Sequence, residues 1–241
     1  KNVMVEKPMV LKTKELKQII KMNKKYKKTI LCLQQQIYRE ETKKLITLIR
    51  NKNLVGKLKK IEGIAFVKVP AQINNSFTDK FISGGGPVID QGSHIIGLII
   101  HLFSRRKIKL ISGNIFYERR EKNKKLIFNV ETRAFLKFKV SENIFFDFET
   151  AYHKKNINFS IKFYFTKGLL HWPSLKFENY KKKNKMKVFN LKKRLASDTQ
   201  FLDYFRKVKL KRSNLSNLNK NLKLVNLIEK SYHKSKKIKL Y

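Results

Sequence analysis

Two short segments of the chain carry side chains that can move or hold a proton. In the first, GGGPVIDQGSH at residues 84–94, Asp90 and His94 are four residues apart, so both project from one face of a helix. An imidazole with an ordinary pKa of about 6.5 accepts a proton near neutral pH, and a carboxylate one turn earlier can orient it or hold a substrate hydroxyl. The same residues also fit a structural interpretation, in which Asp90 bonds the amides of a helix start and His94 packs on the helix side.

The second segment is Glu6-Lys7-Pro8, which directly follows the short apolar run Val3-Met4-Val5. If that run is a strand of an α/β sheet, the tripeptide lies at the carboxyl edge of the sheet, where ligands collect. A solvated turn ended by proline is the open alternative, because a chain with 57 basic residues, only 10 of them arginine, can contain such a tripeptide by chance.

The predicted elements that position these segments change near residue 56, from alternating strands and helices to a series of antiparallel strands. Apolar runs at 3–5 and 29–33 alternate with helical patterns at 11–20 and 45–49, which is typical of a parallel α/β unit. From residue 57 the pattern predicts an antiparallel sheet and three further helices. The expected strands are 61–69, 108–118, 126–140, 144–152, 157–165 and 169–172, and the expected helices are 88–103, 198–207 and 215–233. The predicted fold is therefore α+β, a remnant of a parallel α/β unit followed by an antiparallel β-sheet domain with helices on one face.

Together, in this order and about 80 residues apart, the two segments resemble motifs of the Gfo/Idh/MocA family, the relatives of glucose-fructose oxidoreductase and inositol dehydrogenase. Members place Glu-Lys-Pro after a late strand of a Rossmann domain and carry Gly-Gly-Gly-x-x-x-Asp-x-Gly-x-His on the first long helix of an antiparallel C-terminal domain. The resemblance implies that residues 1–56 are the C-terminal part of a Rossmann NAD(P)-binding domain, which is incomplete here. It also implies that residues 57–241 form an antiparallel-sheet domain for substrate binding and dimerisation.

The chemistry that this resemblance implies is hydride transfer between a nicotinamide, in NAD or NADP, and a CH–OH group of a sugar or polyol, free or nucleotide-linked. His94 would be the acid or base, Lys7 would hydrogen-bond the substrate hydroxyl, and Asp90 would bind a neighbouring hydroxyl or orient the site. Relatives often have a cis Lys-Pro bond, which we expect here between Lys7 and Pro8. The implied cofactor contacts are Glu6, Lys7, Pro8 and Gln35. The implied assembly is a homo-oligomer that forms through the sheet.

The sequence departs from the family pattern at its start. A dinucleotide-binding turn needs Gly-x-Gly-x-x-Gly after its first strand, and the glycines at 84–86 do not supply it, because position 89 is isoleucine. About the first hundred residues of the family are missing, so we expect a fragment that binds NAD(P) weakly by itself. A catalytically inactive remnant that serves as a dimerisation scaffold is the alternative.

Composition excludes several other classes of protein. With 41% hydrophobic and 12% aromatic residues, the chain cannot be disordered throughout. The longest strongly apolar stretch, residues 95–103, is far shorter than the ~20 residues of a membrane-spanning helix. The single cysteine, Cys32, can form neither an internal disulfide nor a Cys-x-x-Cys zinc site, so we expect a cytoplasmic protein without a metal.

The net charge of +40 raises the question of a nucleic-acid partner. The excess is almost entirely lysine, and it is spread along the whole chain instead of being gathered in one segment. Lysine, isoleucine and asparagine have A/T-rich codons, so a mutational bias accounts for their abundance without any partner. Nucleic-acid binding therefore ranks below an oxidoreductase and below a scaffold.

Overall fold

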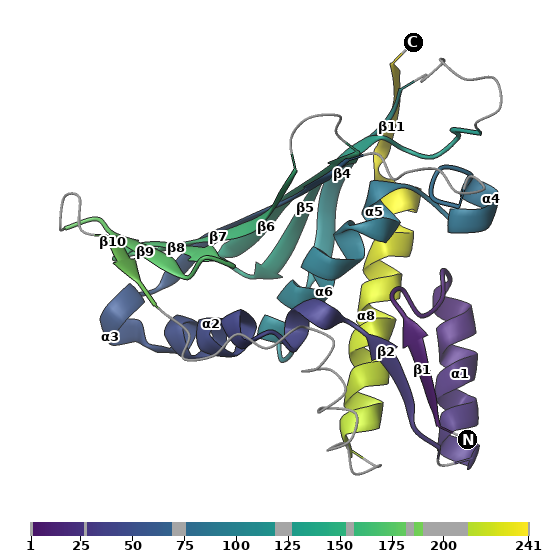
Figure 1. Ribbon diagram of the computed structural model, residues 1–241, viewed down its shortest axis with the longest axis horizontal. Coiled ribbons are helices and arrows are strands. Elements are labelled where there is room, and N and C mark those ends of the chain that lie inside the picture. Colours follow the sequence, from purple (N-terminus) through teal and green to yellow (C-terminus); the bar gives the residue numbers. More distant parts are fainter. Residues whose placement is uncertain are drawn as a thin grey trace.

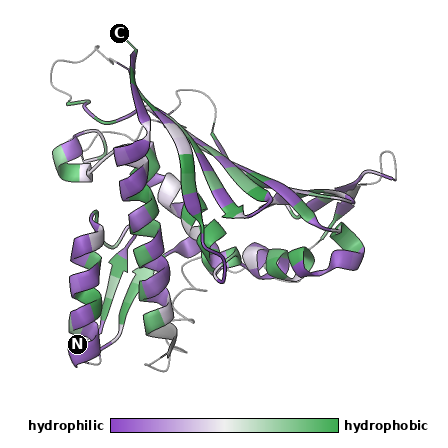
Figure 2. Cartoon of the chain, turned by 180° about the vertical axis from the view of Figure 1, so that it is seen from behind, coloured by the Kyte–Doolittle hydropathy of each residue, from purple (hydrophilic) through white to green (hydrophobic). Residues whose placement is uncertain are grey.

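The computed structural model describes residues 2–26, 28–68, 76–118, 127–152, 157–181, 186–189 and 212–240, which form two sheets with helices packed beside them (Figure 1). The smaller sheet pairs β1 (Val3–Glu6) with β2 (Ile30–Leu33) in parallel, and α1 (Thr13–Tyr26) connects the two strands. Both strands are coloured as hydrophobic in Figure 2, as expected of a parallel sheet. This is the α/β unit that the first residues of the sequence predict.

The larger sheet has nine strands in the order β10-β9-β8-β7-β3-β6-β5-β4-β11. Its neighbouring strands run antiparallel, except that β3 is parallel to β6 and β11 is parallel to β4. The predicted α+β class is confirmed, although β3 is inserted between β6 and β7 and so interrupts a simple meander. The strands are β3 (Leu58–Val67), β4 (Lys109–Glu118), β5 (Arg133–Ser141), β6 (Ile144–Tyr152), β7 (Asn158–Phe165), β8 (Gly168–Trp172), β9 (Lys176–Asn179), β10 (Met186–Val188) and β11 (Lys236–Leu240).

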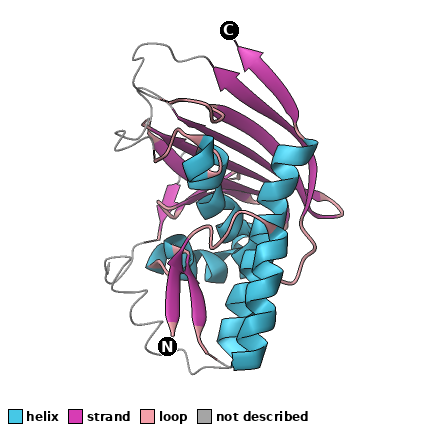
Figure 3. Ribbon diagram, turned by 90° about the vertical axis from the view of Figure 1, so that its right-hand side faces the viewer, coloured by secondary structure: helices cyan, strands magenta, loops and turns pink. Residues whose placement is uncertain are grey.

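The helices of the larger unit lie on one side of this sheet, as Figure 3 shows. Burial alternates along β5, so that Leu136 and Phe138 are buried whereas Lys137 is exposed. Phe138 stacks on Phe146 with ring centroids 5.6 Å apart, in the same core as Ile95. The helices are η1 (Gln35–Ile37), α2 (Glu40–Arg50), α3 (Lys52–Val55), α4 (Lys80–Ser83), α5 (Pro87–Asp90), α6 (Gly92–Leu102) and α8 (Arg212–Lys234).

Helix α8 belongs to the cores of both units. Its Leu224 and Ile228 pack in the core of the large sheet, whereas its Leu218 and Val225 pack with Cys32 against the small sheet. Polar contacts repeat this link: the backbone N–H of Cys32 donates to Asn217 Oδ1 at 3.0 Å, and Gln34 Nε2 donates to Asn221 Oδ1 at 3.3 Å. The carboxyl edge of the small sheet is thereby held at a fixed place beside α6.

Several features of the fold differ from the sequence-based expectation, among them the strand expected at 126–140, which begins only at Arg133. The helix expected at 88–103 is divided at Gln91 into α5 and α6. The short strands β9, β10 and β11 were not predicted, and β11 in particular is mostly lysine. The helix expected at 198–207 lies outside the described residues. No helix within the described ranges is long and apolar enough to cross a membrane.

Candidate active site

Lys7 follows the last residue of β1, and its side chain reaches the end of α5. Its Nζ donates to the backbone carbonyl of Asp90 at 2.6 Å and lies 3.2 Å from Asp90 Oδ1, with the side chains only 12% and 15% exposed. The Lys7–Pro8 peptide bond is cis, as expected. An ammonium has three N–H donors, and these contacts use two of them. Among the described residues no other acceptor is bonded to the Lys7 ammonium, so its third donor can serve a ligand.

The break between α5 and α6 makes this contact possible. In an unbroken helix the Asp90 carbonyl would accept from the N–H of residue 94. Here the N–H of His94 donates to the Gln91 carbonyl at 3.1 Å instead, and the Asp90 carbonyl accepts from Lys7 Nζ and, at 3.1 Å, from Ser93 Oγ. The interruption of the helix at Gln91 thus turns a main-chain acceptor toward Lys7.

His94 lies in the first turn of α6, close to Lys7. Burial and, second, the positive charge of Lys7 lower the pKa of the imidazole to about 3, so His94 is neutral at pH 7. Its Nδ1 is buried and has no hydrogen-bond partner among the described residues, and its ring meets Phe159 edge-on at a centroid distance of 6.1 Å. An unpaired buried polar atom costs about 1–3 kcal/mol, which a ligand hydroxyl would recover.

Lys7 and Asp90 are in contact, and His94 is near enough to Lys7 for the ammonium to lower its pKa, although these residues come from two distant parts of the sequence. The Asp90 carboxylate contacts Lys7 and, through Oδ2 at 3.0 Å, the side-chain amide of Gln91. The contact with Lys7 suits a carboxylate that orients the site, and the binding of a substrate hydroxyl by Asp90 stays a prediction.

Replacing Lys7 with methionine is expected to raise the pKa of His94, because the nearby cation that disfavours the imidazolium is removed. Burial remains, so the pKa should stay below 6.5. A pH titration of the His94 ring resonances by NMR measures this shift directly. The matched control is Lys17→Met on the exposed side of α1, which should leave the titration unchanged. An unaltered His94 pKa in Lys7→Met would contradict the proximity of the two groups.

The three glycines before α5 are held by a carboxylate that the sequence did not reveal. Glu131 is buried, and it accepts hydrogen bonds from the N–H groups of Gly86 at 2.9 Å and Val88 at 3.1 Å and from the Tyr232 hydroxyl at 2.6 Å. A Cβ on Gly86 would lie 2.3 Å from the Glu131 carbonyl oxygen, and one on Gly85 would lie 2.2 Å from the Tyr232 hydroxyl. These glycines serve close packing of the segment that presents Asp90.

Tyr152, at the end of β6, is a second residue that sequence reasoning missed. It is buried, and its pKa is raised first by burial and then by the negative charges of Asp90 and Glu131. Its hydroxyl therefore stays protonated near both carboxylates. Thr150, two residues before Tyr152 in β6, donates to the carbonyls of Ala65 at 2.9 Å and Pro87 at 3.2 Å. These two contacts fix α5 on the sheet.

The remaining predicted cofactor residues lie at the carboxyl edge of the small sheet. Glu6 is exposed and accepts from the Lys7 backbone N–H at 3.1 Å, and Pro8 is half-buried. Gln35 begins η1 just after β2, while its neighbour Gln34 packs against Gly97 of α6. No three histidine, cysteine, aspartate or glutamate side chains in the described part of the chain gather so as to hold a metal ion.

This fold is shared with proteins whose solved structures contain a nicotinamide dinucleotide. KijD10, a 3-ketoreductase from Actinomadura kijaniata solved with NADP and TDP-benzene, matches with a TM-score of 0.84 and 10% identity over 100% of this chain and 73% of its own. GenD2 from gentamicin A biosynthesis, solved with NAD, matches with a TM-score of 0.73 and 14% identity over 97% of this chain and 69% of its own. The sequence matches no family model and no curated protein. At these identities the likeness establishes the fold alone.

Proposed function

We propose that the chain carries the substrate side of an NAD(P)-dependent oxidoreductase, which transfers a hydride between a nicotinamide and a CH–OH group of a sugar or polyol. The observation that carries this proposal is the contact of Lys7 with Asp90 near the buried His94, whose Nδ1 has no hydrogen-bond partner among the described residues. Oxidation of an alcohol needs a proton acceptor and a donor that stabilises the developing alkoxide, and this place offers both. The fold shared with KijD10 and GenD2 supports the same class of reaction.

Each residue has a separate task in this proposal. The neutral His94 imidazole takes the hydroxyl proton as the C–H bond breaks and the carbon becomes a carbonyl. The remaining N–H of Lys7 donates to the same oxygen, and Asp90 holds the ammonium in place through its carbonyl and carboxylate. When bound, the nicotinamide ring supplies the hydride acceptor. In the direction of reduction, the same imidazole returns the proton to the oxygen.

The residues present fit the nicotinamide end of the cofactor. We propose that residues 1–56 correspond to the last strands of a Rossmann domain and residues 57–241 to the substrate domain, with Glu6, Lys7, Pro8 and Gln35 on the nicotinamide side. The parallel pairing of β1 with β2 supports this, and so do Val3 and Met4 of β1, which are 45% and 37% exposed, as suits a sheet that continues past β1. The pyrophosphate needs a glycine-rich turn that the printed sequence lacks.

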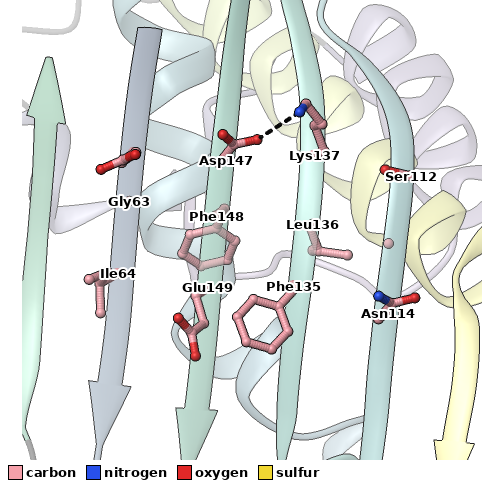
Figure 4. Close-up of a pocket in the computed structure, with 12 residues that line it drawn as sticks. Gly63, Ile64, Ser112, Asn114, Phe135, Leu136, Lys137, Asp147, Phe148 and Glu149 are labelled. Atoms are coloured by element: carbon pink, nitrogen blue, oxygen red, sulfur yellow. Dashed lines mark ion pairs between the residues drawn. The ribbon is translucent and has the colours of Figure 1, made fainter. Parts of the chain in front are cut away.

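We also propose self-association through the sheet face opposite the helices. A groove of about 410 Å³ runs over β3, β6, β5 and β4 there (Figure 4). Its carboxylates are matched by cations: Asp147 pairs with Lys60 at 3.2 Å and with Lys137 at 3.7 Å, and Arg133 Nε donates to Glu149 at 2.7 Å. On a chain of net charge +40, a balanced face is where a second copy meets least repulsion. Light scattering should then give at least twice the 28.7 kDa of this chain.

The enzymatic proposal is tested with protein expressed from its complete reading frame. It is incubated with NAD or NADP and a panel of hexoses, polyols and nucleotide-linked sugars, and reduced nicotinamide and carbonyl product are quantified. The expected result is equal formation of both with at least one alcohol. If the folded protein binds the dinucleotide and oxidises no alcohol in the panel, the oxidoreductase proposal is overturned in favour of a scaffold.

A further inference from the structure

Two adjoining grooves beside the start of β4 are lined by cations and aliphatic side chains, with one carboxylate among the described residues that line them. One groove, of about 430 Å³, lies between the start of β4 and α8 and includes Lys230 and Lys234. The other, of about 1010 Å³, lies between the start of β3, the start of β4 and the turn after β5. Both contain Arg106, Lys107 and Lys109, so they form one continuous depression, named here the basic groove.

The basic groove differs in charge from the groove on the open sheet face. Ten basic side chains and one carboxylate, Glu142, line it. The groove on the open sheet face differs, because there Glu62, Asp147 and Glu149 offset the cations. Lysines that are spread along the sequence are thus brought together by the fold, which the sequence alone did not predict. A concave surface of one sign concentrates the field and favours an anion.

The shape and chemistry of the basic groove indicate an extended polyanion. The combined volume of its two parts is greater than the roughly 300–1,000 Å³ of an ordinary small-molecule site. The floor is aliphatic, with Ile100, Ile108, Leu227 and Ile144, and the described residues that line it include no aromatic side chain on which a base could stack. Eight of its ten cations are lysines, which act as point charges rather than as bidentate readers of base edges.

We propose that the basic groove binds the phosphodiester backbone of a nucleic acid without sequence preference. The proposal is independent of the site formed by Lys7, Asp90 and His94, since no residue is shared between them. A concave groove suits a phosphate chain better than the planar surface of an anionic membrane, which would be met by a protruding apolar face. One cation is partly engaged, because Lys223 Nζ donates to the Ser104 carbonyl at 2.9 Å.

The test compares two triple variants that remove the same charge. Arg106→Gln, Lys107→Gln and Lys109→Gln neutralise the part common to both grooves, whereas Lys17→Gln, Lys21→Gln and Lys24→Gln neutralise exposed positions on α1. Two fluorescent probes are used, a 20-base-pair DNA duplex and an oligo-dT of about 20 nucleotides. Their binding is followed by fluorescence anisotropy over a series of salt concentrations. The groove variant should lose about 10- to 100-fold in affinity at low salt. The slope of its log affinity against log salt concentration should become less steep by about 2–3.

The α1 variant should bind within about 2-fold of the unmodified protein, because it leaves the groove intact. Equal losses in the two variants would show that net charge alone attracts the probe, and would overturn the proposal. Vesicles of phosphatidylserine serve as the second probe. If they bind in a groove-dependent manner and DNA does not, the partner is a membrane and the nucleic-acid proposal is wrong. Circular dichroism confirms that all variants are folded.

Discussion

Replacing His94 with glutamine is expected to lower kcat for alcohol oxidation about 10³-fold, within the 10²–10⁴ range that a positioned acid or base contributes. Glutamine fills a similar space and can hydrogen-bond a hydroxyl, yet it cannot accept its proton. Binding of the alcohol should change much less than turnover, so the loss should be seen mainly in kcat and not in KM. Steady-state measurement of reduced nicotinamide, with the alcohol found in the panel, gives both constants.

The control for this experiment is His101→Gln on the same helix. His101 is also largely buried, and its pKa is lowered to about 4, first by burial and then by Lys220, whose Nζ lies 3.3 Å from its Nδ1. It lies seven residues, about two helical turns, after His94, so its replacement should leave kcat within about 2-fold. Equal losses in the two variants would mean that helix packing, and not proton transfer, explains the effect of His94.

Replacing Gly86 with alanine is expected to destabilise the protein by about 3–5 kcal/mol, the largest stability effect that we predict for a single methyl group. The added Cβ would lie 2.3 Å from the Glu131 carbonyl oxygen, which is backbone and cannot move aside. The shift of the segment would also break the bond between the Gly86 N–H and the Glu131 carboxylate, which is 2.9 Å long. Overpacking costs about 1–3 kcal/mol, and a hydrogen bond to a charged group adds about 1.5–3.

The matched comparison is Gly92→Ala, at a glycine six residues after Gly86. Its Cβ would meet Phe148 at 3.3 Å, and alanine favours the helix by about 1 kcal/mol, so the net change should be close to zero. Chemical denaturation of both variants gives the free energies of unfolding. Similar stabilities for the two variants would contradict the close approach of Gly86 to the Glu131 carbonyl, just before β5.

The order of elements and the two reactive segments could be predicted from the sequence because they rest on local signals. Alternation along β5 and β6, turn residues between strands, and the Glu-Lys-Pro and Gly-Gly-Gly segments are each contained in a few neighbouring residues. The parallel pairing of β3 with β6 could not be predicted in this way, because partners such as Ile64 and Glu149 are far apart in the chain. β11 was missed because Lys236 and its lysine neighbours give no apolar alternation.

The candidate site shows the same limit at the level of single contacts. Helical spacing singled out Asp90 and His94 as candidates, but it could not show that the Asp90 carbonyl accepts from Lys7. Glu131 stands alone between Val130 and Thr132, and only tertiary packing against Gly86 gives it a role. Long-range partners of this kind depend on the register of whole elements, which a local pattern does not contain.

Helix α8 has a consequence for how the protein responds to a ligand. It contributes Leu218 to one core and Leu224 to the other, and its Asn217 bonds the strand that precedes η1. A rotation of the small unit away from the large one would have to bend this helix or pull it out of one core. Ligand capture by hinge closure between these two units is therefore disfavoured, and the distance between Lys7 and His94 is set before any ligand arrives.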